Sequence, residues 1–218
     1  MSRTPDLSRR TLALGLACAP FAGLLAAGPA AAALPAADQA LVNRAVAYLE
    51  GLTQAKGTFV QTDPRGVTTQ GEIFLKRPGK ARFAYAAPSG LLVVSDGNLV
   101  SVANSKLKTF ESYPLGATPL SLFLARQIRL DRGVQVTRVS RLADGFSITA
   151  RDGKKEAEGQ ITLTFSDAPM KLVGWTITDP QGQGTRVRLT RLDKVASLDD
   201  SLFVLKDPRN LRPGRSRM

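Results

Sequence analysis

Residues 161–189 read ITLTFSDAPMKLVGWTITDPQGQGTRVRL, and apolar side chains alternate with polar ones in three runs of this stretch. The alternating apolar positions are Ile161-Leu163-Phe165, Val173-Trp175-Ile177 and Val187-Leu189. Asp167-Ala-Pro169 and Asp179-Pro-Gln-Gly182 lie between the runs, and these residue types favour turns. A period of two predicts strands with one apolar and one polar face. The stretch therefore predicts three antiparallel strands in consecutive hairpins.

The same pattern continues outside this stretch. Phe146-Ile148-Ala150 also alternates, and Asp96-Gly97, Asp144-Gly145 and Asp152-Gly153 are further turn signals. A spacing of roughly eight to fifteen residues between turns is typical of an antiparallel meander. We therefore predict a mainly β fold of about 10–11 strands that curls to bury its apolar face. A membrane barrel is not expected, because three tyrosines and one tryptophan are too few for aromatic girdles.

Helical periodicity precedes the strands, over residues 38–52. Asp38 is a candidate N-cap, and Gly51 lies near the end. The apolar residues that recur at helical spacing are Leu41, Ala45, Tyr48, Leu49 and Leu52. One amphipathic helix is therefore predicted before the β-rich region.

A short apolar helix is predicted between strands, over residues 118–125. Thr118 occupies an N-cap position and Pro119 the first helical position. The residues of its apolar face are Leu120, Phe123 and Leu124. By themselves, these residues favour a plug over one end of the barrel core. A second short helix is predicted with Asp199 and Asp200 in its first turn, near the positive helix end.

The amino terminus has the features of an export signal. Arg9 and Arg10 precede an apolar run, residues 12–27, which ends in small residues up to Ala33. This order is typical of a cleaved secretory signal, and paired arginines favour the twin-arginine route. We expect residues 1–33 to be the signal peptide, cleaved near Ala33, and the mature protein to be periplasmic. Cys18 is a poor lipidation site, because the preceding Gly-Leu-Ala lacks the usual branched residue.

The composition argues against an enzyme. The chain has no histidine, and its single cysteine, Cys18, lies in the predicted signal. The mature chain therefore offers no disulfide, no His or Cys metal site and no Ser-His-Asp triad. Ser105 and Lys108 match Ser-x-x-Lys, but the companion motifs of that chemistry are absent and the segment resembles an exposed strand. We expect no catalytic residue, no metal and no cofactor.

The chain is basic, with a formal net charge of +12. Residues 1–33 hold three arginines and Asp6, so their removal leaves about +10. Such a charge favours an anionic membrane, an acidic partner or nucleic acid, and nucleic acid is the weakest choice for an exported protein. Most basic residues are spread over many segments, as on a solvated surface. Residues 211–218 form a predicted basic tail.

Four blocks in the first half carry a family resemblance. They are Gly57-Thr-Phe-Val-Gln61, residues 71–79 (GEIFLKRPG), residues 82–88 (RFAYAAP) and residues 92–97 (LVVSDG). In this order and spacing they resemble the periplasmic outer-membrane lipoprotein carrier family, LolA. The resemblance implies one domain over residues 34–210, an incomplete antiparallel β-barrel. Short helices would then form a lid over an apolar cavity, in place of the plug.

The resemblance also assigns candidate site residues. The arginine matching Arg77, in Lys-Arg-Pro, bonds to backbone groups of the lid helices in the family. A guanidinium suits this task because its five fixed donors can satisfy carbonyls at helix ends. Alternation and resemblance together suggest the cavity lining, while each of these residues is also a candidate for ordinary core. The suggested residues are Phe59, Phe83, Tyr85, Val93, Leu120, Phe123, Leu124, Trp175 and Ile177.

The function implied is a carrier that binds the acyl chains of lipoproteins without catalysis. An inner-membrane ATP-driven lipoprotein-releasing complex would supply the lipoprotein, and an outer-membrane lipoprotein receptor would accept it from the monomeric carrier. Residues 99–104 lack the aromatic strand that members often have at this place, which leaves the acceptor open. The alternatives are a periplasmic carrier of another lipid or amphiphile, and a filled barrel that serves as an envelope scaffold or sensor.

Overall fold

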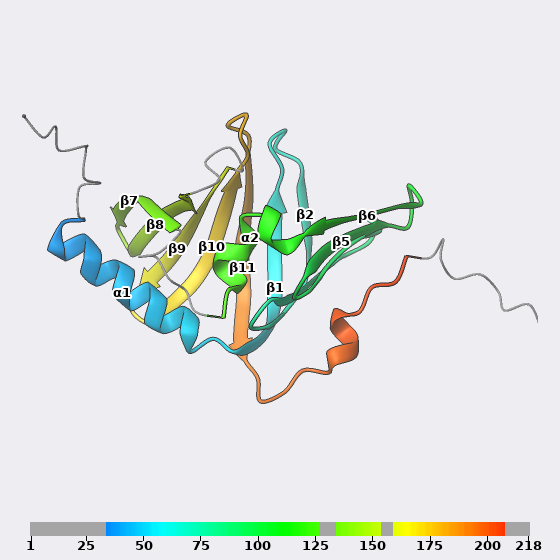
Figure 1. Cartoon of the computed structure of the whole chain (residues 1–218), viewed down its shortest axis with the longest axis horizontal. Coiled ribbons are helices and arrows are strands. Elements are labelled where there is room, and N and C mark those ends of the chain that lie inside the picture. The colour runs from blue at the N-terminus through cyan, green and yellow to red at the C-terminus, as the bar shows by residue number, and fades with distance from the viewer. Residues whose placement is uncertain (1–33, 127–133, 154–158, 208–218) are drawn as a thin grey trace, which may run out of the picture. The chain divides into compact units, whose positions relative to one another are not determined.

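The computed structural model describes residues 34–126, 134–153 and 159–207 (Figure 1). The predicted signal peptide and the predicted basic tail lie outside these described residues. The strands are β1 (Gln54–Thr62), β2 (Thr68–Lys76), β3 (Lys80–Tyr85), β4 (Leu91–Asp96), β5 (Leu99–Asn104), β6 (Thr109–Pro114), β7 (Val134–Leu142), β8 (Gly145–Asp152), β9 (Gln160–Asp167), β10 (Met170–Thr178) and β11 (Gly184–Lys194). The helices are α1 (Ala36–Glu50), η1 (Leu115–Ala117), α2 (Leu120–Leu124) and η3 (Asp200–Phe203).

All eleven of these strands form one antiparallel sheet. Their order is β6-β5-β4-β3-β2-β1-β11-β10-β9-β8-β7, so every pair is consecutive in sequence except β1 with β11. The edge strands β6 and β7 follow each other in the chain, and the segment between them carries η1 and α2 (Figure 1). The prediction of an open, mainly β meander with an N-terminal helix is confirmed.

The predicted turns connect the strands as expected. The carboxylate of Asp179 accepts hydrogen bonds from the backbone N–H groups of Gln181 (3.0 Å) and Gln183 (2.8 Å). Asp96 does the same for Asn98 and Leu99, both at 2.8 Å. These aspartates therefore fix the hairpins through their side chains. Residues 105–108 also form a turn, between β5 and β6, so the expectation of an exposed strand there is wrong.

The pairing of β10 with β9 shows that Leu172, and not Val173 as predicted, is buried on the inner face. The pairing with β9 runs from Leu172, opposite Phe165, directly to Gly174, opposite Thr164. Val173 is therefore the extra residue of a bulge, and Leu172 takes the buried position with 2% exposure. Strict alternation through Val173 failed because a bulge shifts the period by one residue.

A second bulge explains a glycine of the first sequence block. The pairing of β1 with β11 shifts at Thr58 and Phe59. At Gly57, a Cβ atom would lie only 2.0 Å from the backbone oxygen of Arg191. The two strands approach so closely here that only glycine fits.

The helix starts differ from the predictions. Pro35 occupies the N-cap of α1, and Asp38 lies in the first turn. The Thr118 hydroxyl donates back to the Leu115 carbonyl at 2.9 Å, so it does not cap α2. Asp199, expected in the first turn of the second short helix, is instead its N-cap and accepts from the Ser201 N–H at 2.7 Å, whereas Asp200 lies in the first turn as predicted. This element is a 3₁₀ helix.

Both faces of the sheet carry an apolar cluster. The inner face packs against α1 and α2 and holds most of the buried side chains. The outer face of β2–β4 is covered by residues 195–205, which follow β11. Side chains of this outer cluster are Phe74, Leu92, Val94, Val195, Leu198, Leu202, Phe203 and Leu205. In Figure 1 this covering segment runs through η3, away from α1 and α2.

Candidate functional site

The turn between β2 and β3 binds the carboxyl-terminal ends of both helices. Arg77 donates from Nη1 to the Leu49 carbonyl, in the last turn of α1. Its Nη2 donates at 2.6 Å to the carbonyl of Ala125, directly after α2. The backbone N–H of Gly79 donates at 2.8 Å to the Leu124 carbonyl. One turn therefore donates to three carbonyls at the carboxyl-terminal ends of the two helices.

The backbone of this turn requires glycine. Gly79 has φ of +78°, and a Cβ there would lie 2.7 Å from the Cα of Gly97. Any side chain would meet this backbone and strain the left-handed conformation. Glycine therefore keeps the Gly79 N–H directed at α2.

Arg77 is half-buried between the helices and the sheet. Burial lowers the pKa of its guanidinium, and the nearby carboxylate of Glu50 opposes this shift. Arginine remains protonated throughout the physiological range, so the bonds persist there. Its Nε is buried and has no hydrogen-bond partner among the described residues. The two Nη atoms thus carry the interaction with α1 and α2.

Five aromatic side chains form a continuous row beneath α2. Tyr85 meets Phe59 edge-to-face with 5.1 Å between ring centroids, and Phe59 meets Phe83 at 5.7 Å. Phe83 then contacts Trp175 at 6.0 Å. Trp175 stacks on Phe123 of α2 at 5.7 Å. The row links β1, β3 and β10 to the short helix.

All nine suggested lining residues belong to this one inner cluster. Phe59, Phe83, Phe123, Leu124 and Trp175 are buried, whereas Tyr85, Val93, Leu120 and Ile177 are half-buried against them. Phe59 and Phe123 are each only 1% exposed. The side chains therefore fill the space between α2 and the sheet in this state. The structure brings these residues together, and their role in binding is argued below.

Tyr85 ends the row in a polar contact. Its hydroxyl donates to the side-chain oxygen of Gln61 at 2.6 Å. Burial raises the pKa of Tyr85 to about 12, with the Gln61 bond acting in the opposite sense. The hydroxyl is therefore neutral in the physiological range.

The residue-by-residue prediction missed the half of the interior under α1. Phe146 and Phe165 are cross-strand partners whose rings stack at 5.3 Å, and Tyr48 of α1 meets Phe165 at 6.1 Å. Arg44 lies over the Phe146 ring at 5.7 Å and pairs with Asp167 at 2.9 Å. The alternating positions of Phe146 and Phe165 were the available signal, because both share the apolar face of their strands.

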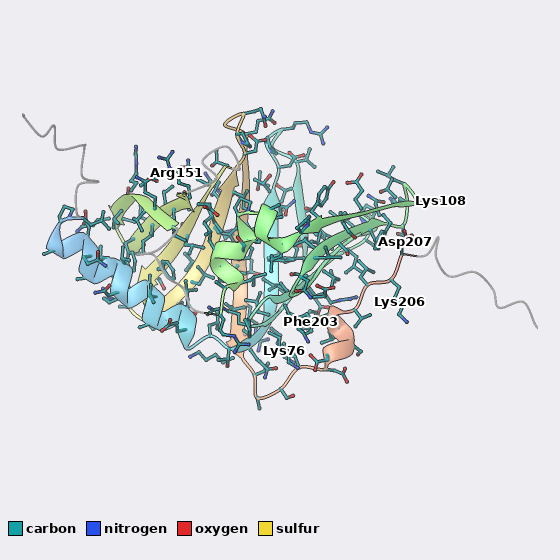
Figure 2. All side chains as sticks on the ribbon, in the orientation of Figure 1. Lys76, Lys108, Arg151, Phe203, Lys206 and Asp207 are labelled. Atoms are coloured by element: carbon teal, nitrogen blue, oxygen red, sulfur yellow. The ribbon has the colours of Figure 1, made fainter. Side chains whose placement is uncertain are left out.

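The outer cover is held by cations of the same hairpin. Lys76 and Lys80 lie 2.9 Å and 2.7 Å from one carboxylate oxygen of Asp200. The Lys76 ammonium also donates to the Leu198 carbonyl at 2.9 Å, and Arg82 donates to the Leu202 carbonyl at 3.0 Å. Figure 2 labels Lys76 at the hairpin and Phe203 on η3. These contacts fasten residues 198–202 to the outer face.

The sequence was then compared with known families. Residues 50–206 match the model of the outer membrane lipoprotein carrier protein LolA. This chain belongs to the LolA family. The match covers the Arg77 turn, the aromatic row and the outer cover, and it begins at the last residue of α1.

Curated LolA relatives are similar over most of their length. An outer-membrane lipoprotein carrier protein of Chromobacterium violaceum is 25% identical over 88% of this chain and 96% of its own. One of Chromohalobacter salexigens is 29% identical over 86% of this chain and 94% of its own. A solved LolA superfamily structure from Nitrosomonas europaea is 10% identical, with a TM-score of 0.42 over 75% of this chain and 97% of that one.

The described residues of this LolA family member include no helix that is both long and apolar enough to cross a membrane. They also contain no group of three or more His, Cys, Asp or Glu side chains arranged to hold a metal ion. The contacts beneath α2 and at its end are made by the aromatic row, Arg77 and the Gly79 backbone.

Proposed function

We propose that this protein is a lipoprotein carrier that holds acyl chains between the sheet and a lid formed by α1 and α2. The observation that carries this proposal is the Arg77–Gly79 turn, which binds the ends of both helices above the aromatic row. A lid fastened by a few hydrogen bonds over an apolar interior can open without unfolding the sheet. The family and the names of its relatives support the same function.

Because side chains fill the space under α2, cargo enters only when the lid moves. Exposing Phe123 and Leu124 costs about 1.5–3 kcal/mol for each side chain. Burial of one long acyl chain contributes about 0.8 kcal/mol per CH₂, on the order of 10 kcal/mol in total. One acyl chain can therefore offset the opening of α2. The half-buried Leu120, Val93 and Ile177 would contact the chain with the aromatic row.

The proposed transport route follows from the predicted export signal and from the burial of the acyl chain. Residues 1–33 direct the chain to the periplasm and are cleaved near Ala33, which leaves the carrier domain (34–210) and its basic tail (211–218). An inner-membrane ATP-driven complex supplies the lipoprotein to the monomeric carrier, and an outer-membrane receptor accepts it. The carrier needs no cofactor and makes no covalent bond, because it transfers a buried apolar chain.

The first test is native mass spectrometry of the mature protein, purified from the periplasm with a co-expressed acylated lipoprotein. A one-to-one complex that disappears when the acylated cysteine of the lipoprotein is replaced is the expected result. Free lipid bound in place of lipoprotein would support a carrier of another amphiphile. A protein that never binds either would support the filled scaffold or sensor, which the close packing around Phe123 favours.

Arg77→Leu tests the lid directly. Loss of its two hydrogen bonds should shift the lid towards the open state and slow the transfer of a bound lipoprotein to acceptor membranes. Lys80→Leu is the matched control, because it removes a cation of the same hairpin that faces the outer cover. Unchanged transfer by Arg77→Leu would remove Arg77 from the mechanism.

A further inference from the structure

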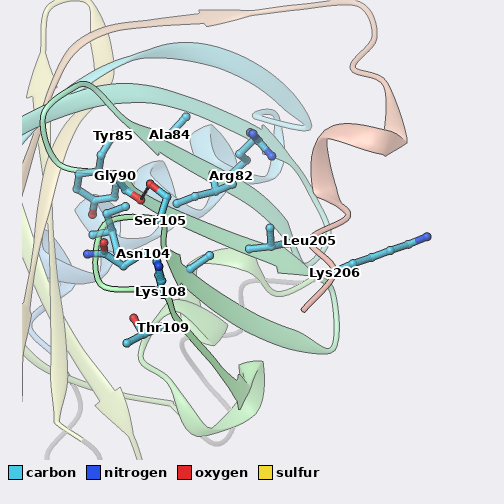
Figure 3. A pocket seen from close by; sticks show the side chains of 13 residues that line it. Arg82, Ala84, Tyr85, Gly90, Asn104, Ser105, Lys108, Thr109, Leu205 and Lys206 are labelled. Atoms are coloured by element: carbon cyan, nitrogen blue, oxygen red, sulfur yellow. Dashed lines mark hydrogen bonds between the residues drawn. The ribbon is translucent and has the colours of Figure 1, made fainter. Parts of the chain in front are cut away.

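The outer face carries a groove that the proposed carrier function does not use. It has a volume of about 770 Å³ and lies between strands β3–β6 and the end of the covering segment (Figure 3). Its lining residues are Arg82, Ala84, Tyr85, Gly90, Leu91, Leu92, Ala103, Asn104, Ser105, Lys108, Thr109, Leu205 and Lys206. This volume is within the range of about 300–1,000 Å³ typical of small-molecule sites.

Small side chains on neighbouring strands create the hollow. Ala84, Leu92 and Ala103 are directly paired across β3, β4 and β5, so they form one row of the outer face. Because two of these three side chains are alanines, the row rises less far above the sheet than large side chains would, and this leaves a hollow. The covering segment packs Phe203 on the adjacent rows, and Val204 is 55% exposed where that packing ends. Leu205 then forms a wall of the groove.

The groove and the inner site use opposite faces of the same strands. Phe83 and Val93 point into the inner cluster, whereas their neighbours Ala84 and Leu92 line the groove. Tyr85 alone among the groove's lining residues also contacts the aromatic row. A ligand in the groove would therefore be separated from the inner site by the sheet.

The charge of the groove is entirely positive. Arg82, Lys108 and Lys206 line it, and none of the described residues that line it is acidic. Lys108 and Lys206 are exposed, whereas Arg82 is half-buried and already donates to the Leu202 carbonyl. Near Lys108 one end is closed by Ser105, whose hydroxyl donates to the Gly90 carbonyl at 3.2 Å (Figure 3). An anionic group would be attracted to the exposed cations at the rim.

We propose that this groove binds a single-chain anionic amphiphile, such as a fatty acid. Its alkyl chain would cover the Ala84–Leu92–Ala103 row and Leu205, and its anionic head would lie near Lys108. An apolar floor without charge would accept any alkyl chain. The cations at the rim select the anionic head, and the width of one row of side chains suits one alkyl chain.

The test is titration of the purified protein with palmitate, followed by NMR of the alanine methyl groups and of the Trp175 indole. The methyl signals of Ala84 and Ala103 should shift, and a shift of the Trp175 indole would report separate entry of palmitate into the inner site. Monopalmitin, a neutral ester with the same chain, should bind at least about fivefold more weakly, because it lacks the charge attracted by Lys108. Shifts confined to Trp175, or equal binding of monopalmitin, would overturn the proposal. Ala84 and Ala103 report the groove and Trp175 reports the inner site, so failure of this proposal and failure of the proposed carriage are distinguishable.

Two variants sharpen this test. Lys108→Glu should weaken palmitate binding about fivefold, whereas Lys106→Glu is the control because Lys106 lies in the same turn but does not line the groove. Ala103→Phe should fill the floor and reduce binding at least about tenfold. Equal effects of the two lysine variants, or unchanged palmitate binding by folded Ala103→Phe, would contradict the proposal.

Discussion

One hairpin, β2–β3, fastens a cover on each face of the sheet, and the two covers are held by different physics. On the inner face, Arg77 and Gly79 bind only backbone carbonyls, above a closely packed aromatic row. On the outer face, Lys76 and Lys80 form ion pairs with Asp200, above a smaller apolar cluster. The Arg77 contacts are therefore independent of pH down to acid conditions, whereas the contacts of Lys76 and Lys80 weaken in acid, when Asp200 is protonated.

Because different bonds hold the two covers, one cover can open without the other. The inner bonds join one turn to the ends of two helices, so breaking them releases the end of α2, whereas Arg44 and Tyr48 still hold α1 to the sheet. The outer bonds are spread over Leu198, Asp200 and Leu202, which lie along one segment and can detach in steps. We therefore expect cargo entry to move the inner cover while residues 195–205 remain in place.

The largest expected effect compares two phenylalanines that are each 1% exposed. Phe123→Ala should lower the free energy of unfolding by about 3–5 kcal/mol, because the closed interior cannot collapse around the missing ring. Phe203→Ala should cost only about 2 kcal/mol, since the terminal segment can detach locally and limit the loss. Urea unfolding monitored by circular dichroism measures both. Equal losses would show that the two covers are equally integrated into the fold.

A smaller effect separates the two arginines of the hairpin. Arg77→Leu should cost about 2–3 kcal/mol in unfolding, because the partly buried carbonyls of Leu49 and Ala125 lose a charged donor. Arg82→Leu should cost about 1 kcal/mol, because it loses one such bond. Arg77→Lys, which cannot span both carbonyls, should fall between these values. Chemical denaturation of the three variants tests this order, and a larger loss for Arg82→Leu would reverse the comparison.

Acid should loosen the outer cover selectively. Hydrogen bonds from Lys80 and Lys76 lower the pKa of Asp200 below the ordinary value of 3.8. A lowered pKa contributes stability above the unfolded value, and that contribution is lost as the pH falls through the folded value. Between pH 5 and pH 3, the protection factor of the Leu202 amide should therefore fall, while the protection factors of amides in α2 should change less. Parallel loss of protection in both would contradict the distinction.

The smallest expected effect comes from Asp200→Asn. This variant should leave thermal stability at pH 7 nearly unchanged, because exposed ion pairs contribute little. It should nevertheless remove most of the acid dependence of Leu202 exchange, since no carboxylate remains to be protonated. Persistence of the full pH dependence would assign it to another group, of which Asp199 is the nearest candidate with a lowered pKa.

Local sequence patterns predicted which strands and helices form, but they predicted less well where each helix begins. Alternation identified the strands, and aspartates such as Asp96 and Asp179 located the turns, because these signals act between neighbouring residues. The caps were less predictable. Pro35 took the position expected for Asp38, and Thr118 bonded to the preceding turn, since a cap depends on where the flanking chain enters.

Part of the candidate site could also be predicted from the sequence, because alternation acts between neighbouring residues. Alternation placed Phe59, Phe83 and Trp175 on the apolar face, and the structure unites them with Phe123. It could not reveal that these rings fill the space beneath α2, because packing density depends on the distance between elements. The aromatic pair under α1 was missed, although both residues share that face.

By itself, the sequence determined the period-two strands, the turns, the apolar faces and the basic charge, because each depends on residue type and short spacing. Only the tertiary structure decided the pairing of β1 with β11, the bulge at Val173 and the carbonyls that Arg77 reaches. It also decided that residues 195–205 pack on the outer face and leave a groove over the Ala84–Leu92–Ala103 row beside Leu205. These features join segments far apart in the chain, whose relative positions follow from the curvature of the whole sheet.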